Sequence, residues 1–168
     1  MARLLVWCLL GMAVPAGATS WPVLSLARQT TAVDAWEQVR VLPDPTRQLD
    51  AAAARAALPR FALPESAKGN LGPRAGVSWL HVPVAVAANA PAQWTLRMSY
   101  PLLHEVRVHV FDAQGRELQT VRLGTKVPFS ERETKTRTLT APLNLVPGQV
   151  HDVLVQVALP LVLILAIA

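Results

Sequence analysis

The strongest constraint on the fold is a run of alternating apolar and polar residues between positions 76 and 123. In residues 94–100, tryptophan, leucine, methionine and tyrosine alternate with threonine, arginine and serine. Residues 106–110 repeat the alternation, with three valines separated by Arg107 and His109. A β-strand sends successive side chains to opposite faces, so each run predicts a strand with one apolar and one solvent-exposed face. Such strands need a second layer over the apolar face, which favours an all-β sandwich.

Further strands are predicted on both sides of these runs. They are expected at residues 36–42, 77–86, 118–123, 135–145 and 150–157, of which the last two form a closing pair. Trp79 falls opposite in phase to the aliphatic residues of its run, so that strand is predicted to be apolar on both faces and central. Pro83 removes a hydrogen-bond donor from the same strand, which predicts a bulge or an edge position. A total of about seven or eight strands is normal for a sandwich.

One helix is predicted in the alanine-rich stretch from Gln48 to Leu58. Alanine has the highest helix propensity, Asp50 is a suitable N-cap, and Pro59 ends the helix. The apolar stripe of this helix is thin, so we expect the helix to lie on the surface or to cover one end of the sandwich.

The first residues have the three-part pattern of a secretory signal peptide. A positive residue, an apolar stretch and the small residues Ala16 and Ala18 predict residues 1–18 as the signal, with cleavage after Ala18. The only cysteine, Cys8, lies inside this segment. The mature chain is therefore expected to carry no disulfide and no catalytic thiol, and to depend on its apolar core for stability.

The remaining chain is divided into three parts. Residues 19–34 are polar and small, and are predicted to be a flexible arm; residues 35–157 form the sandwich, and residues 158–168 an apolar tail. As a helix, the twelve apolar residues 157–168 would cover about 18 Å of a roughly 30 Å bilayer core, and Pro160 interrupts them, so a membrane anchor is not expected. We expect this tail to be the abrupt end of a fragment of a longer protein.

The charge pattern argues against nucleic acid as a partner. The formal net charge is +5, but the densest basic cluster, residues 132–137, is interleaved with Glu131 and Glu133. A mixed pattern of this kind is typical of a solvated surface.

No residue constellation indicates an enzyme, a metal or a cofactor. His104 and Glu105 begin like a zinc motif, but the next histidine, His109, is five residues on, which on a strand points to the opposite face. Glu131 and Glu133 form a carboxylate pair whose basic neighbours favour charge compensation over catalysis. Phosphate-binding and dinucleotide-binding motifs and a nucleophile elbow are not found in the sequence.

Two residues are candidates for ligand binding. Trp94, with Trp79 and Tyr100, has an aromatic face suited to stacking on a sugar, although its phase in the apolar row also fits core packing. Arg132 lies in a loop-like stretch between strands, where binding residues gather, although a solvated arginine is an equal interpretation.

Several segments resemble one known family. The run 77–84 is similar to its Trp-Leu-Arg-Phe-x-Leu strand, and the run 94–115 to its Trp-x-Leu…Pro…Leu-Asp-x-Val-x-Leu-Tyr segment. Residues 124–132 resemble its Gly…Pro-Phe…Arg loop, and 141–148 its closing turn. The family is the second type of extracellular domain of bacterial seven-transmembrane receptors with diverse intracellular signalling modules. The resemblance covers roughly Ala35 to Val157.

This resemblance implies a jelly-roll sandwich similar to carbohydrate-binding modules, exported to the periplasm as a sensor. It departs from the family pattern at His81, which replaces the usual arginine, and in lacking the seven membrane helices and the cytoplasmic output module, such as a diguanylate cyclase or histidine kinase. The expected function is therefore ligand sensing for a receptor, with carbohydrate or a related small molecule as ligand. The alternative is a periplasmic protein–protein interaction or structural module without a small-molecule ligand.

Overall fold

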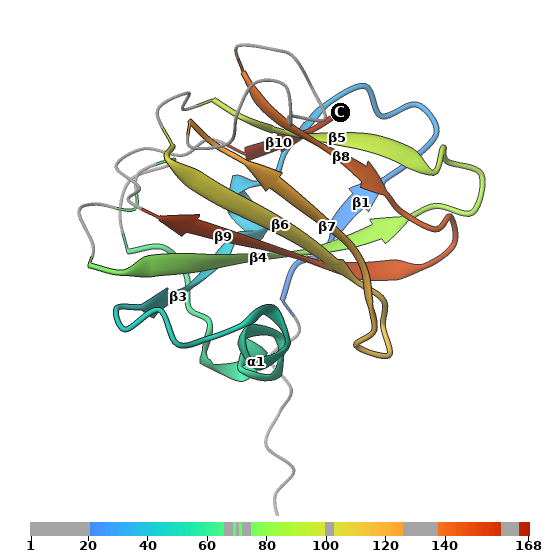
Figure 1. Cartoon of the computed structure of the whole chain (residues 1–168). Coiled ribbons are helices and arrows are strands. Elements are labelled where there is room, and N and C mark those ends of the chain that lie inside the picture. The colour runs from blue at the N-terminus through green and yellow to red at the C-terminus, as the bar shows by residue number, and fades with distance from the viewer. Residues whose placement is uncertain are drawn as a thin grey trace, which may run out of the picture.

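The computed structural model describes residues 21–65, 69, 71, 75–99, 103–125, 138–158 and 165–168. Two β-sheets pack face to face, and one short helix, α1, lies beneath the larger sheet (Figure 1). The prediction of an all-β sandwich with one short helix is confirmed. The predicted signal peptide and its cleavage site at Ala18 lie outside the described residues.

The larger sheet has six strands and the smaller sheet has four. The larger has the order β1 (Leu24–Leu26), β4 (Val77–Val86), β9 (Val150–Ala158), β6 (Glu105–Phe111) and β7 (Glu117–Leu123), with β3 (Arg40–Asp44) also paired to β4. The smaller has the order β2 (Val33–Asp34), β10 (Leu165–Ile167), β5 (Gln93–Met98) and β8 (Leu139–Asn144). All pairs are antiparallel except β1 with β4.

The core between the sheets follows the predicted alternation. On β6 the side chains of Val106, Val108 and Val110 are fully buried, and on β5 those of Leu96 and Met98 are as well. Burying a side chain of this size contributes roughly 1.5–3 kcal/mol to the hydrophobic driving force. The two-residue period of the sequence therefore identifies the inner face of each sheet.

Pro83 lies in the central strand β4, at a position where no neighbouring strand needs a hydrogen bond from its nitrogen. Residues 77–81 of β4 pair with β3, and residues 84–86 pair with β1 along the same edge. The amide of Val86 donates to Gln149 on the β9 side, and that of Ala87 donates to Leu26 on the β1 side. Because successive amides alternate, the nitrogen of Pro83 faces the edge where β3 has ended and β1 has not begun.

Two strand predictions differ from the structure. The strand expected at 36–42 forms only in its second half, because residues 36–38 are a 3₁₀ helix and the strand, β3, spans Arg40–Asp44. The expected closing pair does not form, because β8 belongs to the smaller sheet and β9 to the larger. The turn between them carries the chain from one sheet to the other, with Gly148 at φ 80°.

The structure also differs from the predicted domain boundaries. The expected arm contains β1 and β2, and the expected tail contains β10, which lies between β2 and β5. Leu165 and Ile167 are fully buried, and Ala168 exchanges two backbone hydrogen bonds with Thr95. These strands have two or three residues, which is too short for alternation to be recognised in a sequence.

The predicted helix is confirmed in a shorter form. Helix α1 spans Ala51–Ala56, and the Asp50 carboxylate caps it by accepting a hydrogen bond from the Ala53 amide at 2.7 Å. Pro59 lies in the 3₁₀ helix Leu58–Arg60 that follows. The helix packs against the outer face of the larger sheet rather than over one end of the sandwich (Figure 1).

Candidate functional site

The outer face of the larger sheet carries a second, smaller apolar cluster under α1. It joins the helix to four strands and consists of Leu42, Ala51, Ala54, Phe61, Val77, Trp79, Phe111 and Leu154. The side of β6 that the sequence predicted to be solvent-exposed is therefore partly covered. His109, on that side, is only 7% exposed.

A half-buried ion network ties α1 to the sheet. Asp152 on β9 accepts a hydrogen bond from Arg55 Nη2 at 3.0 Å and lies 2.8 Å from His81 Nε2. Burial raises the pKa of Asp152, but the hydrogen bond and charge of His81 and the charge of Arg55 outweigh it, so the pKa lies below its usual value. Asp152 is thus a carboxylate at neutral pH, and its role is to anchor the helix.

A second histidine–carboxylate pair lies further along the same face. His109 Nδ1 is 2.7 Å from Glu117 Oε1, and Thr120 donates a short hydrogen bond to the same oxygen. Burial raises the pKa of Glu117, but the hydrogen bonds from Thr120 and His109 outweigh it and hold the pKa below its usual value. The Glu117 carboxylate therefore accepts hydrogen bonds from both His109 Nδ1 and the Thr120 hydroxyl.

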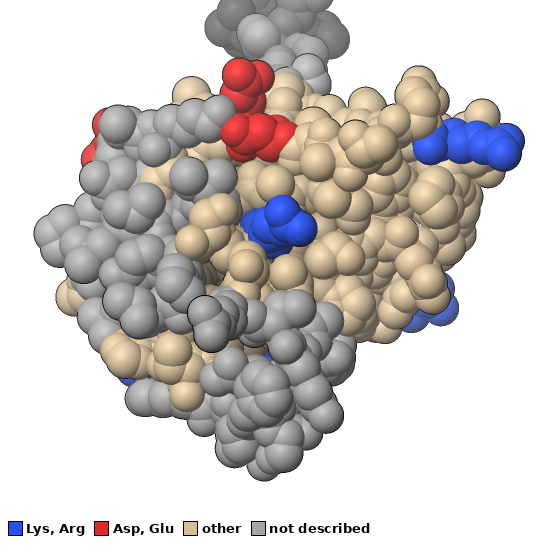
Figure 2. Space-filling model, turned by 90° about the horizontal axis from the view of Figure 1, so that it is seen from above, with Lys and Arg blue, Asp and Glu red and all other residues tan. Residues whose placement is uncertain are grey.

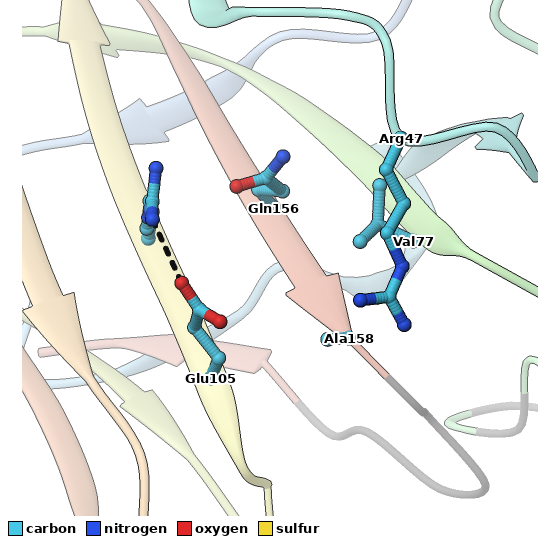
Figure 3. Close-up of a pocket in the computed structure, with 6 residues that line it drawn as sticks. Arg47, Val77, Glu105, Gln156 and Ala158 are labelled. Carbon is cyan, nitrogen blue, oxygen red and sulfur yellow. Dashed lines mark hydrogen bonds and ion pairs between the residues drawn. The ribbon is translucent and has the colours of Figure 1, made fainter. Parts of the chain in front are cut away.

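A polar groove lies between this pair and the loop that precedes α1. One hollow of about 540 Å³ is lined by strand residues, by the loop before α1 and by the start of α1: Trp79, Arg107, His109, Glu117, Thr120 and Gln156, then Arg47 to Asp50, then Ala51 and Ala52. A second of about 220 Å³ shares Arg47, Arg107 and Gln156 and adds Val77, Glu105 and Ala158. Figure 3 shows Arg47 and Glu105 on opposite sides of the smaller hollow, with Gln156 between them.

The loop that carries Arg47 is held firmly. The buried carboxylate of Asp44 accepts hydrogen bonds from the amides of Gln48 and Leu49 and from the Thr46 hydroxyl. Burial raises the pKa of Asp44, but these bonds outweigh it and lower the pKa overall. A Cβ on Gly76 would come within 2.3 Å of the Asp44 carbonyl oxygen, so the loop also packs directly on the start of β4.

Three polar atoms around the groove have no hydrogen-bond partner in the described part of the chain. They are Trp79 Nε1, His109 Nε2 and Arg107 Nε, and each of these atoms is buried. An unpaired buried donor or acceptor costs about 1–3 kcal/mol. Their gathering at one groove is the feature that best distinguishes it as a binding site.

Trp94, one of the two residues that the sequence singled out, does not line this groove. Trp94 is 4% exposed, packs in the core between the sheets, and donates its indole hydrogen to the Pro91 carbonyl at 2.7 Å. It therefore has no solvent-facing ring surface for a sugar. Arg132 and the pair Glu131 and Glu133 lie outside the described residues.

The groove residues were not recognised as a site from the sequence. Arg107 and His109 were visible in the alternating run, but the pattern could not show that a helix partly covers that face. Arg47 carries no signal of its own, because it lies in a proline-containing turn far from β6 in the sequence.

The sequence model of one protein family, 7TMR-DISM extracellular 2, matches residues 37–167, most of the chain. The chain belongs to this family. The family comprises extracellular sensor domains of seven-transmembrane receptors, which confirms the resemblance and an extracellular sensing role. It is not a family of enzymes. A search of curated proteins found no match to the chain.

Two further observations concern this 7TMR-DISM extracellular 2 domain. Among the described residues, no helix is both long and apolar enough to cross a membrane. Within the same ranges, no three or more His, Cys, Asp or Glu side chains gather in a way that could hold a metal ion.

Proposed function

We propose that this domain senses a carbohydrate or related small polar molecule in the periplasm, as the ligand-binding part of a seven-transmembrane receptor. The observation that carries the proposal is the polar groove on the larger sheet, where three buried polar atoms have no partner among the described residues. A ligand that hydrogen-bonds to these atoms removes the cost of leaving them unpaired. The mixed charges of the groove and the unpartnered N–H of Trp79 at its floor suit a molecule with several hydroxyl groups.

The proposal is tested by thermal unfolding of the purified chain in the presence of sugars and small carboxylates. A ligand that binds only the native state stabilises it by about 2.7 kcal/mol at a concentration of 100 Kd. We therefore expect a concentration-dependent rise in melting temperature with at least one class of compound.

The absence of any response across such a panel would contradict ligand sensing by this groove. It would favour the alternative function, a module that contacts another periplasmic protein or domain and binds no small molecule.

A further inference from the structure

One end of the groove is basic. Arg47 and Arg107 line both hollows; the smaller also contains Glu105, whose Oε1 lies 2.8 Å from Arg107 Nη2, and the larger also contains Asp50 and Glu117. No carboxylate of the described residues forms an ion pair with Arg47, and Arg107 Nε is unpaired. In the smaller hollow, two guanidinium groups and one carboxylate leave an excess of positive charge. A guanidinium with free N–H groups is suited to bind a carboxylate.

The backbone of Arg47 is strained. Its φ is 58°, and it is the only non-glycine residue of the described chain with a positive φ. The left-handed conformation costs a residue with a Cβ roughly 1–2 kcal/mol compared with the ordinary one. The loop fixes that conformation through Asp44 and Gly76 rather than through any contact of the arginine side chain. A glycine at position 47 would adopt this conformation without strain. That an arginine stands there points to a function of its side chain.

The floor of the groove next to this basic end offers two ring nitrogens without a partner in the described structure, Trp79 Nε1 and His109 Nε2. The two rings lie side by side, with centroids 5.8 Å apart. A hydroxyl group is both a donor and an acceptor, so it can accept from the indole N–H and also bond to the imidazole nitrogen. Arg107 and His109 are two residues apart on one face of β6, about 7 Å, which is comparable to the width of one sugar ring.

We propose that the groove binds a hydroxylated carboxylate of the uronic acid class. The carboxylate lies between Arg47 and Arg107, and a ring hydroxyl bonds to Trp79 and His109. This inference rests on the proposed sensing function and specifies the ligand of the same groove. The groove should prefer acidic sugars to neutral ones, because a neutral sugar leaves the Arg47 guanidinium without a counter-charge.

The test is calorimetric titration of the purified chain with D-galacturonate and D-glucuronate, each compared with its neutral parent, D-galactose or D-glucose. Two charge-assisted hydrogen bonds between the carboxylate and the arginines predict that a uronate that fits the groove binds roughly ten- to a hundredfold more tightly than its neutral parent. We expect at least one uronate to show this preference. Acetate, which has the carboxylate without the hydroxyl groups, should bind more weakly than that uronate.

The decisive variant is Arg47→Gly. Glycine adopts the observed φ freely, so the melting temperature of this variant should be unchanged or higher than that of the wild type. Its affinity for the uronate should nevertheless fall by ten-fold or more. Loss of binding in a protein that is at least as stable as the wild type cannot be attributed to misfolding.

Trp79→Phe tests the floor of the groove. Phenylalanine keeps an aromatic ring and removes an N–H that has no partner in the described structure, so the affinity for the uronate should fall by roughly three- to tenfold. The matched control is Arg97→Ala, an exposed arginine on β5 in the other sheet, which should leave the affinity unchanged.

The possible outcomes separate the two proposals. If neutral sugars bind as tightly as the uronates, or if Arg47→Gly binds as the wild type does, the uronate inference is wrong and ligand sensing stands. If no compound of the panel binds, both proposals are wrong.

Discussion

The outer faces of the two sheets differ, although both come from strands with the same two-residue alternation. On the larger sheet, α1 covers an apolar cluster and a half-buried ion network, and a polar groove lies beside the helix. On the smaller sheet, the outward residues of β5 and β8 are mostly small or uncharged: Gln93, Thr95, Arg97, Thr140, Pro142 and Asn144. On this side the described residues show few charged side chains (Figure 2). One outer face is therefore a second core with a site beside it, whereas the other is an ordinary sheet surface.

The difference arises because a short helix needs a surface on which to bury its apolar side. Ala51 and Ala54 are small enough for α1 to approach the sheet closely, and Trp79 and Leu154 fill the space between helix and strands. The helix covers only part of the six strands, so the uncovered part becomes the groove. The position of α1 thus determines where a ligand can approach.

The largest effect is expected from the residue that joins the helix to the sheet. Leu154 on β9 is fully buried on the outer face, so Leu154→Ala should lower the free energy of unfolding by about 3 kcal/mol. Thr95→Ala, at an outward position of β5, should lower it by less than about 1 kcal/mol. Urea unfolding of both variants measures the contrast. Equal effects would show that the two outer faces are alike.

An intermediate effect is expected from the ion network. Asp152→Ala removes the partner of both Arg55 and His81, whose side chains are 24% and 4% exposed, and should cost about 2 kcal/mol. The control on the smaller sheet, Arg97→Ala, should change stability by less than about 0.5 kcal/mol. Both are measured by urea unfolding at pH 7. If Asp152→Ala left the free energy of unfolding unchanged, the network would not hold α1 in place.

The smallest effect concerns a histidine between the sheets. His151 on β9 is fully buried, its Nε2 accepts a hydrogen bond from the Val146 amide, and burial lowers its pKa below 6.5. The unfolded chain therefore takes up a proton at this residue as the pH falls below 6.5, while the folded chain does not, so stability declines with falling pH.

His151→Gln should flatten that decline between pH 6.5 and 5 in unfolding experiments. The control is His104→Gln, at an exposed histidine whose Nδ1 lies 3.0 Å from the Thr125 hydroxyl oxygen; it should leave the slope unchanged. An identical pH profile for wild type and His151→Gln would show that His151 is not held neutral by burial.

Much of the fold was predictable because its signals are local. The alternation of residues 94–98 and 106–110 identified β5 and β6, and the phase of Trp79 identified β4 as a strand buried on both faces. Asp50 indicated the helix cap. In contrast, β1, β2 and β10 were missed, because strands of two or three residues carry no period. The assignment of β8 and β9 to different sheets was missed because a turn sequence does not show which sheet the next strand joins.

The candidate site was predicted less well than the fold. Trp94 was considered for its aromatic face, but its place in the apolar row put it in the core. Arg107 and His109 were seen as the polar side of a strand, and only their position beside α1 makes them part of a groove. Arg47 reaches the same groove from a turn about sixty residues earlier in the chain, a proximity that no local pattern records.

By itself, the sequence determined which residues form strands, which face of each long strand is apolar, and where the helix begins. These properties depend on side-chain order and backbone propensity, which act over a few residues. Only the tertiary structure decided which strands pair, which outer face the helix covers, and which polar atoms are left without a partner. Those depend on how apolar surfaces far apart in the chain bury one another, because burial responds to area and shape rather than to sequence spacing.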